Sequence, residues 1–187
     1  MIAIIDYDAG NLTSVARAVN YIGEENCITK DPDQIEKADR IIFPGVGSAG
    51  SAMSSLGKYG LNREIKEAFE KGKPILGICL GSQIILDKSH ENNTDCLGLI
   101  AGRVPAFSTH MKDSDGGSLK IPQMGWNTIG DLRSDLFTSV PENSFAYFVH
   151  GYYATLGKHT IAKTDYIQTY SAALQKDNFY GVQFHPE

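Results

Sequence analysis

The sequence of 187 residues has few cysteines, one tryptophan, no long apolar run and no excess of positive charge. Its three cysteines, Cys27, Cys79 and Cys96, are an odd number at wide spacing, which favours free thiols in a reducing cytoplasm over a disulfide framework. The net charge of −5 argues against nucleic acid or an anionic membrane surface as partner. No stretch approaches transmembrane length, and no Cys-x-x-Cys or His-x-x-x-His pattern predicts a metal site. We therefore expect a cytoplasmic protein without a metal or cofactor.

The remaining composition, 42% apolar and 21% charged, is typical of a globular chain, and its length predicts one domain over residues 1–187. In the first half, short apolar runs at 2–5, 26–29, 41–43 and 75–78 alternate with helical periodicity at 12–22 and 61–71. This alternation predicts an α/β fold of the flavodoxin-like, doubly wound type, with a mostly parallel central sheet.

The second half has a different pattern, because strands separated by turns replace the alternation of strands and helices. We expect strands at 98–107, 125–129, 145–149, 160–163, 171–175 and 180–184. Some of them should add antiparallel strands to the C-terminal half of the fold. A polar, glycine-bearing segment at 112–118 is expected to be a surface loop.

The stretch from Lys73 to Leu86 contains the main candidate for a catalytic motif. Its apolar run leads into Cys79, which has glycines two residues before and two residues after it, at Gly77 and Gly81. This spacing is typical of a strand-to-helix elbow that carries a nucleophile. A thiol at a helix N-terminus is favoured as the thiolate, and the next backbone N–H points toward an oxyanion. The alternative is that Cys79 is a small buried core residue.

The C-terminal stretch 179–187 favours the nucleophile interpretation. It is predicted to be a strand, on which His185 and Glu187, two residues apart, share one face. A carboxylate that orients a histidine facing a thiol completes a Cys-His-acid triad. His150 is a rival base, but it has no carboxylate two residues away.

Three other positions have two interpretations each. The loop 44–48 follows a buried strand, and a backbone amide there would supply a second oxyanion donor, or the loop is a plain turn. Gln83, one helical turn after Cys79, would bind a polar substrate, or it is a solvated helix residue. Trp126 is a core residue or an anchor at a partner surface.

These motifs together resemble the class I glutamine amidotransferases, and within that class the glutaminase subunits of imidazole glycerol phosphate synthase. The nucleophile and His-Pro-Glu motifs are common to the class, whereas the Asp-Tyr…Gly-Asn and Met-Gly-Trp-Asn stretches point to that subunit. The similar stretches are Ile5-Asp6-Tyr7 with Gly10-Asn11-Leu12, Phe43-Pro44-Gly45-Val46-Gly47, Gly77-Ile78-Cys79-Leu80-Gly81 with Gln83, Pro122 with Met124-Gly125-Trp126-Asn127, Tyr147-Phe148-Val149-His150 with Tyr152, and Gly181 to Glu187.

The resemblance implies the hydrolysis of L-glutamine to glutamate and ammonia, with Cys79 as nucleophile and His185, oriented by Glu187, as proton shuttle. The oxyanion would be held by the backbone amides of Leu80 and Val46. The residues expected to hold glutamine are Gly45, Gly47, Gln83, Gly151 and Tyr152. Gly151 stands where the family usually has Ser or Thr, so we expect a backbone contact there. Gln123 replaces a common His, and Ser82 replaces a common apolar residue.

The resemblance also implies a heterodimer in which ammonia passes to a (β/α)₈-barrel cyclase of histidine biosynthesis. The interface residues implied are Asn11, Pro122, Met124 and Trp126. Relatives continue past Glu187 by about one helix, so we expect this sequence to lack the family's last element. Two alternatives stay open: a paralogous glutaminase that feeds another acceptor, and a non-catalytic elbow-cysteine sensor or binding protein.

Overall fold

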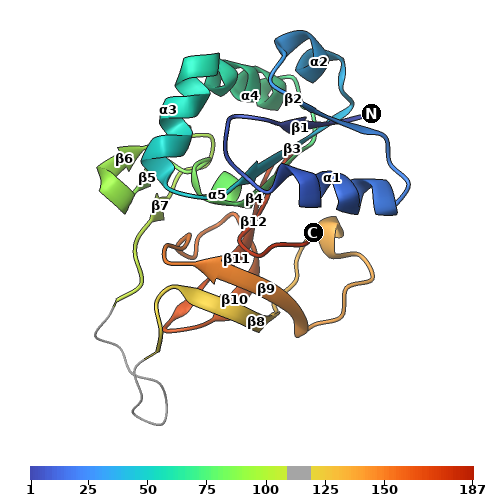
Figure 1. The fold of residues 1–187 in the computed structure, drawn as a ribbon. Coiled ribbons are helices and arrows are strands. Elements are labelled where there is room, and N and C mark those ends of the chain that lie inside the picture. The colour runs from blue at the N-terminus through green and yellow to red at the C-terminus, as the bar shows by residue number, and fades with distance from the viewer. Residues whose placement is uncertain (109–118) are drawn as a thin grey trace.

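The computed structural model describes residues 1–108 and 119–187, and its main element is a seven-stranded sheet in the order β10-β11-β12-β4-β3-β1-β2 (Figure 1). Five neighbouring strands are parallel: β1 (Ile2–Ile5), β2 (Asn26–Thr29), β3 (Arg40–Gly45), β4 (Ile75–Cys79) and β12 (Phe179–Val182). The strands β11 (Thr169–Lys176) and β10 (Thr160–Asp165) extend the sheet in antiparallel fashion. The predicted α/β class, with antiparallel strands added in the C-terminal half, is confirmed.

Each face of the sheet has its own apolar core. Helices α2 (Pro32–Lys37), α3 (Ala49–Tyr59) and α4 (Leu61–Glu70) cover one face, and α1 (Leu12–Tyr21) lies on the other (Figure 1). The second face is also covered by a two-stranded antiparallel sheet of β8 (Gln123–Ile129) and β9 (Ser144–His150). Strand β1 shows why both faces are apolar: Ala3 and Ile5 enter one core, and Ile2 and Ile4 enter the other.

Shorter elements complete the described part of the chain. The elbow helix α5 (Leu80–Gln83) follows β4, and a small sheet joins β5 (Lys88–Ser89), β6 (Thr94–Asp95) and β7 (Arg103–Val104). Two 3₁₀ turns are η1 (Glu91–Asn93) and η2 (Asp135–Phe137). None of the described helices has the length and apolar character needed to span a membrane.

The helices expected from periodicity are confirmed, with corrections at their ends. Helix α1 ends before Gly23, whose φ of 82° is the left-handed conformation expected there, but Ile22 is exposed instead of buried. Helix α4 buries Leu61 and Ile65 as expected. The elbow helix is shorter than predicted, because the chain turns after Gln83 and buries Ile84 and Ile85 outside it.

Two strand predictions are wrong in extent. A strand over 98–107 reduces to β7, because Gly98 and Gly102 have φ values of 67° and 159° that interrupt an extended run. Strand β12 ends at Val182, so His185 and Glu187 lie beyond it. The segment 112–118 lies outside the described residues. Helices α2 and α3 were not expected. The buried Ala49, Ala52 and Leu56 of α3 lie at helical spacing, but two of the three are alanines, whose small side chains give a weak apolar signal.

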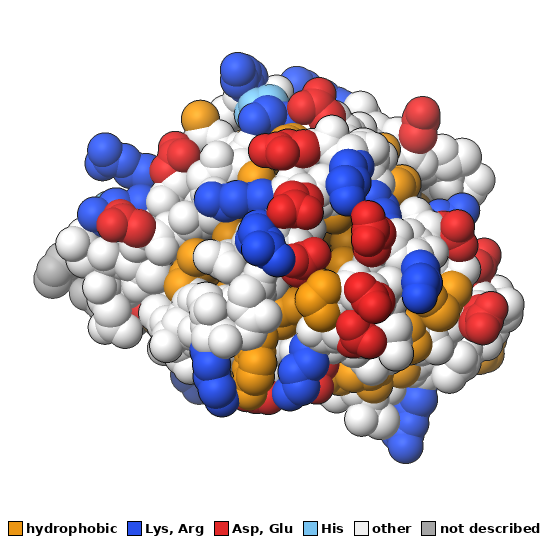
Figure 2. All heavy atoms as spheres, turned by 90° about the horizontal axis from the view of Figure 1, so that it is seen from above, with side chains coloured by type: hydrophobic (Ala, Val, Ile, Leu, Met, Phe, Trp, Pro, Cys, Tyr) orange, Lys and Arg blue, Asp and Glu red, His pale blue; other side chains and the backbone are white. Residues whose placement is uncertain are grey.

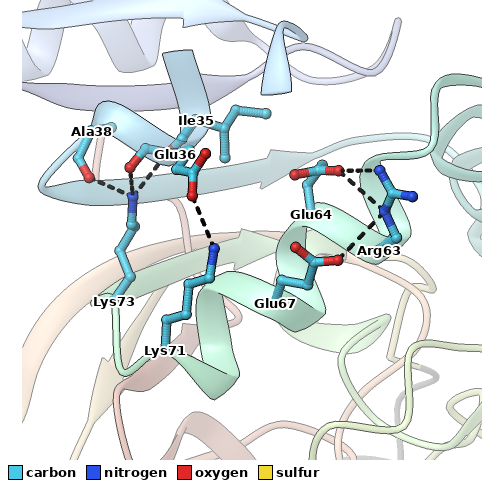
Figure 3. A network of polar contacts seen from close by, with 8 residues as sticks. All are labelled: Ile35, Glu36, Ala38, Arg63, Glu64, Glu67, Lys71 and Lys73. Atoms are coloured by element: carbon cyan, nitrogen blue, oxygen red, sulfur yellow. Dashed lines mark hydrogen bonds and ion pairs between the residues drawn. The ribbon is translucent and has the colours of Figure 1, made fainter. Parts of the chain in front are cut away.

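Polar contacts fasten the helical face to the start of the elbow strand (Figure 3). The Lys73 ammonium donates to the carbonyls of Ile35, Glu36 and Ala38 at 2.8, 2.7 and 2.6 Å, which satisfies the end of α2. Burial lowers the pKa of Lys73. The nearby Lys71–Glu36 pair is exposed, and such pairs contribute little. Figure 2 shows charges of both signs interspersed over this face, with apolar areas between them.

The elbow fits the sheet because glycines stand at its closest backbone contacts. A Cβ on Gly81 would collide with the carbonyl oxygen of Phe43 on β3, and a Cβ on Gly45 would lie 2.8 Å from the backbone nitrogen of Gly81. The end of β3 and the first turn of α5 are therefore in backbone contact. This contact places the loop after β3 beside Cys79.

We expect Gly81→Ala to destabilise the fold by about 3 kcal/mol, because the backbone of β3 cannot move away from the added methyl group. The matched control is Gly57→Ala in the interior of α3, where a Cβ meets nothing within 4 Å. That control should gain up to about 1 kcal/mol from helix propensity. Urea unfolding followed by circular dichroism measures both, and equal midpoints for Gly81→Ala and wild type would contradict the argument.

Candidate active site

Cys79 stands at the end of β4 in a strained backbone conformation, with φ 53° and ψ −110°. Positive φ is costly for a residue with a side chain, and it is typical of functional turns. The sulfur is buried beside two polar groups: Gln183 Nε2 donates to it at 3.7 Å, and the Val149 carbonyl lies 3.9 Å away. The predicted elbow is therefore present, although only four residues of helix follow it.

His185 and Glu187 form the pair that their spacing suggested, but not on a strand. Nδ1 of His185 lies 2.9 Å from Oε1 of Glu187. The chain leaves β12 after Val182, and His185 is held instead by its backbone N–H, which donates to the Tyr147 carbonyl of β9 at 2.9 Å. Pro186 has no N–H to continue a ladder, so the pair is positioned by β9.

The electrostatics of His185 connect it to the cysteine. Its interactions with Cys79, and then with Glu187, raise the pKa of His185 to about 10 against the opposing effect of burial. Burial would raise the pKa of Glu187, but the hydrogen bond from His185 holds it below its ordinary value. The Nε2 atom of His185 is buried, and no described residue forms a hydrogen bond of ordinary length and angle with it. That nitrogen is available to the sulfur and to a ligand.

His150, the rival base, is occupied. Its Nδ1 lies 2.7 Å from the Tyr152 carbonyl, and its Nε2 lies 3.0 Å from the Tyr170 hydroxyl. Burial lowers the pKa of His150 to about 4, so the ring is neutral at physiological pH. The preference for His185 over His150 agrees with these contacts.

A cavity of about 390 Å³ joins most of the expected site residues. Eight of them line it: Val46, Gly47, Cys79, Leu80, Gln83, Gly151, Tyr152 and His185. Gly45 is buried behind this wall, in register with Cys79 across β3 and β4. Glu187 instead lines an adjacent apolar groove of about 530 Å³, together with Trp126.

Two polar residues of the site were missed by sequence reasoning. Glu91 lines the cavity from η1, and its Oε2 accepts from the backbone N–H of Ala49 at 2.6 Å. No motif surrounds Glu91, so only the fold reveals it. Gln183 lies in the recognised C-terminal stretch, and it contacts both the sulfur and Gln83, whose Nε2 donates to Gln183 Oε1 at 2.8 Å. Gln83 is thus buried, not a solvated helix residue.

The four residues expected at a partner surface lie in two places. Asn11 caps α1, where its side chain accepts from Ser14 N–H. Pro122 and Met124 line a shallow cavity with Tyr166, and Trp126 lies two residues further along β8. Met124 and Trp126 are 65% and 70% exposed, so Trp126 is not a core residue. Among residues 1–108 and 119–187, no three acidic, His or Cys side chains are grouped to hold a metal ion.

Comparison with known proteins identifies the class. The class-I glutamine amidotransferase family matches residues 3–187, and the chain belongs to that family of enzymes. It is similar to subunit HisH of imidazole glycerol phosphate synthase from Bacteroides fragilis, at 47% identity over all of this chain and 91% of the relative. The HisH subunit of Maridesulfovibrio salexigens is 44% identical over all of this chain and 89% of its own.

Solved structures agree on the fold. A crystal structure of a glutamine amidotransferase superposes with a TM-score of 0.75 at 14% identity, covering 100% of this chain and 90% of the other. The glutaminase domain of Trypanosoma brucei CTPS, with bound acivicin, gives a TM-score of 0.67 at 15% identity, covering 99% of this chain and 85% of that domain. At these identities the likeness concerns the fold alone.

We expect His185 to titrate near pH 10, and its pKa to fall in Cys79→Ala because that change removes the largest cause of the shift. A folded pKa raised above the ordinary 6.5 stabilises the protein fully below pH 6.5. That stability is lost as the pH rises toward about 10, so the wild type should lose more stability over this range than Cys79→Ala. NMR of the imidazole nitrogens measures the pKa.

The matched control is Cys96→Ala, which removes a partly buried thiol outside the cavity. His150 is an internal reference, because with a pKa of about 4 it should stay neutral throughout the titration. A His185 pKa that is the same in wild type and Cys79→Ala would contradict the assigned interaction.

Proposed function

We propose that residues 1–187 form one glutamine amidotransferase domain that hydrolyses L-glutamine and supplies ammonia to the synthesis of imidazole glycerol phosphate. One observation carries the catalytic assignment: Cys79 and His185 line the same cavity, and His185 is hydrogen-bonded to Glu187. Sequence similarity to HisH subunits supports the choice of pathway.

In the first half of the reaction, the Cys79 sulfur attacks the carboxamide carbon of glutamine. A protonated His185 favours the thiolate form of the sulfur and then gives its proton to the departing nitrogen, so the C–N bond breaks and ammonia leaves. The backbone N–H groups of Val46 and Leu80 would hold the oxyanion, because both residues line the cavity on either side of Cys79.

In the second half, a thioester joins the substrate to Cys79. His185 takes a proton from water, the resulting hydroxide attacks the thioester carbon, and the C–S bond breaks to release glutamate. Glu187 keeps the imidazole oriented with Nε2 toward the cavity. Glu91 is the carboxylate in the cavity with its second oxygen left for a substrate ammonium, so we assign it, with Gln83, Gly47, Gly151 and Tyr152, to glutamine binding.

We expect Cys79→Ser to reduce glutamine hydrolysis by at least about a thousandfold, since a hydroxyl is a far weaker nucleophile than a thiolate. The complex with the synthase partner should still form product from free ammonium, because only the glutamine reaction is lost. Cys96→Ser is the matched control and should retain activity. Glutamine hydrolysis by Cys79→Ser at the wild-type rate would exclude this mechanism.

We infer that the partner is a cyclase of the (β/α)₈-barrel type and that it docks on strand β8. Most large apolar side chains of the described residues are buried, whereas Met124, Trp126 and Phe145 on β8 and β9 are 65%, 70% and 69% exposed. Exposed aromatic and methionine side chains that gather on one surface are typical of protein interfaces. Asn11 contributes from the start of α1.

We expect Trp126→Ala to weaken binding of the cyclase about thirtyfold, the effect of a central aromatic anchor worth about 2 kcal/mol. Its ring is 70% exposed and meets Tyr147 at a centroid distance of 5.7 Å, so the isolated subunit should keep most of its stability. Leu156→Ala, at another exposed apolar residue, is the control and should bind like wild type. Calorimetry with the purified cyclase gives the affinities. Unchanged binding by Trp126→Ala would show that Trp126 is not an anchor of the interface.

A further inference from the structure

A buried chain of polar side chains connects the first residue of β8 to the wall of the glutamine cavity. Gln123 and His150 are direct neighbours across the β8–β9 ladder, and Tyr170 reaches both from β11 in the main sheet. All three are buried, at 2%, 6% and 0% exposure. The catalytic mechanism uses none of them.

The chain continues into the cavity through backbone and side-chain contacts. His150 Nδ1 lies 2.7 Å from the Tyr152 carbonyl, and that carbonyl also accepts from Gln83 Nε2 at 2.8 Å. Tyr152 and Gln83 both line the cavity, and Gln83 is linked through Gln183 to the sulfur of Cys79. The His150 ring is therefore in direct contact with the backbone of one cavity wall.

The Tyr170 hydroxyl has one hydrogen, so it cannot donate a hydrogen bond to both of its neighbours at once. Its hydroxyl lies 2.7 Å from Gln123 Oε1 and 3.0 Å from His150 Nε2. A neutral His150 that donates from Nδ1 to the Tyr152 carbonyl must accept at Nε2, and Gln123 Oε1 can only accept. One hydroxyl hydrogen thus faces two acceptors.

The position of the Gln123 amide determines which of the two acceptors receives the Tyr170 hydrogen. In the arrangement with Oε1 toward Tyr170, the amide and His150 Nε2 compete for the one hydroxyl hydrogen, so the bond to His150 is weakened. Turned over, or moved away with β8, the amide leaves the hydrogen to His150. The two arrangements differ only in a side chain adjacent to the exposed Met124.

We propose that Gln123, Tyr170 and His150 are a positioning relay in which Gln123 competes with His150 for the Tyr170 hydrogen, so that movement of β8 tightens or loosens the glutamine cavity. This inference rests on the proposed function, since it concerns the binding of glutamine. It gives a partner bound to Met124 and Trp126 a physical path to the cavity that requires no movement of the main sheet.

The relay predicts opposite effects for two single substitutions. Tyr170→Phe removes the hydrogen, frees His150 to rotate, and should weaken glutamine binding about five- to tenfold, the effect of one lost hydrogen bond. Gln123→Leu removes the competitor and leaves the hydrogen to His150, so glutamine should bind more tightly than to wild type. Tyr166→Phe is the control, because its hydroxyl donates to the Lys120 carbonyl and not toward the cavity.

Binding is measured on the isolated subunit as the glutamine concentration that halves alkylation of Cys79 by iodoacetamide, with the modified residue identified by peptide mass. This readout needs no turnover. Steady-state kinetics of the cyclase complex provide a second readout. Tyr170→Phe should raise KM for glutamine while kcat changes less than about twofold, because the groups that touch the reacting atoms are unchanged. Thermal unfolding verifies that each variant is folded.

Wild-type affinity in Tyr170→Phe would overturn the relay, and so would an equal loss of affinity in both variants. If Cys79 is protected by glutamine but the complex does not turn glutamine over, the proposed function fails while the relay is still tested by binding. If glutamine protects Cys79 in no variant, both fail together. Opposite shifts in the two variants, with Tyr166→Phe unchanged, would establish the relay.

Discussion

The structure depends on the backbone contact between the end of β3 and the first turn after Cys79. Gly81 stands against the carbonyl of Phe43, and Gly45 against the nitrogen of Gly81, so two neighbouring strands end within van der Waals reach of each other. The positive φ of Cys79 is maintained by this packing on both sides of the elbow. Without the contact, the thiol and the amide of Val46 would have no fixed relation.

The two histidines of the cavity show how the environment assigns roles to one side chain. His185 is partly buried but lies between a thiol and a carboxylate, and these partners raise its pKa to about 10. His150 is more deeply buried, faces a carbonyl and a hydroxyl, and its pKa falls to about 4. Hydrogen bonding to a charged partner overcomes desolvation in the first case and is missing in the second. Only His185 is suited to carry a proton at neutral pH.

The sequence predicted those parts that have local patterns. The parallel strands, α1, α4, the elbow and the His185–Glu187 pair all follow from periodicity or short spacings. Glu91 and Gln183 were missed because their approach to the cavity comes from tertiary packing, which no local spacing records. The end of β12 was placed too late, at Phe184 or as far as Glu187, since apolar residues continue to Phe184 after the ladder stops at Val182. Helix α3 was missed because its buried stripe of Ala49, Ala52 and Leu56 consists mostly of small residues, which give a weak apolar signal.

The position of the cavity between two sheets explains why such tertiary contacts matter. Cys79 belongs to the main sheet, whereas Val149, His150 and Tyr152 belong to β9 and the residues just after it, so the cavity has one wall from each sheet. The sheets are joined by isolated backbone bridges, such as the one between Tyr147 and His185, and by side chains that include Tyr170. They share no continuous backbone ladder in the described part of the chain. A rigid nucleophile then faces a wall whose position depends on a few hydrogen bonds. In the proposed complex, a partner bound to β8 would act on that wall and leave the strained elbow intact.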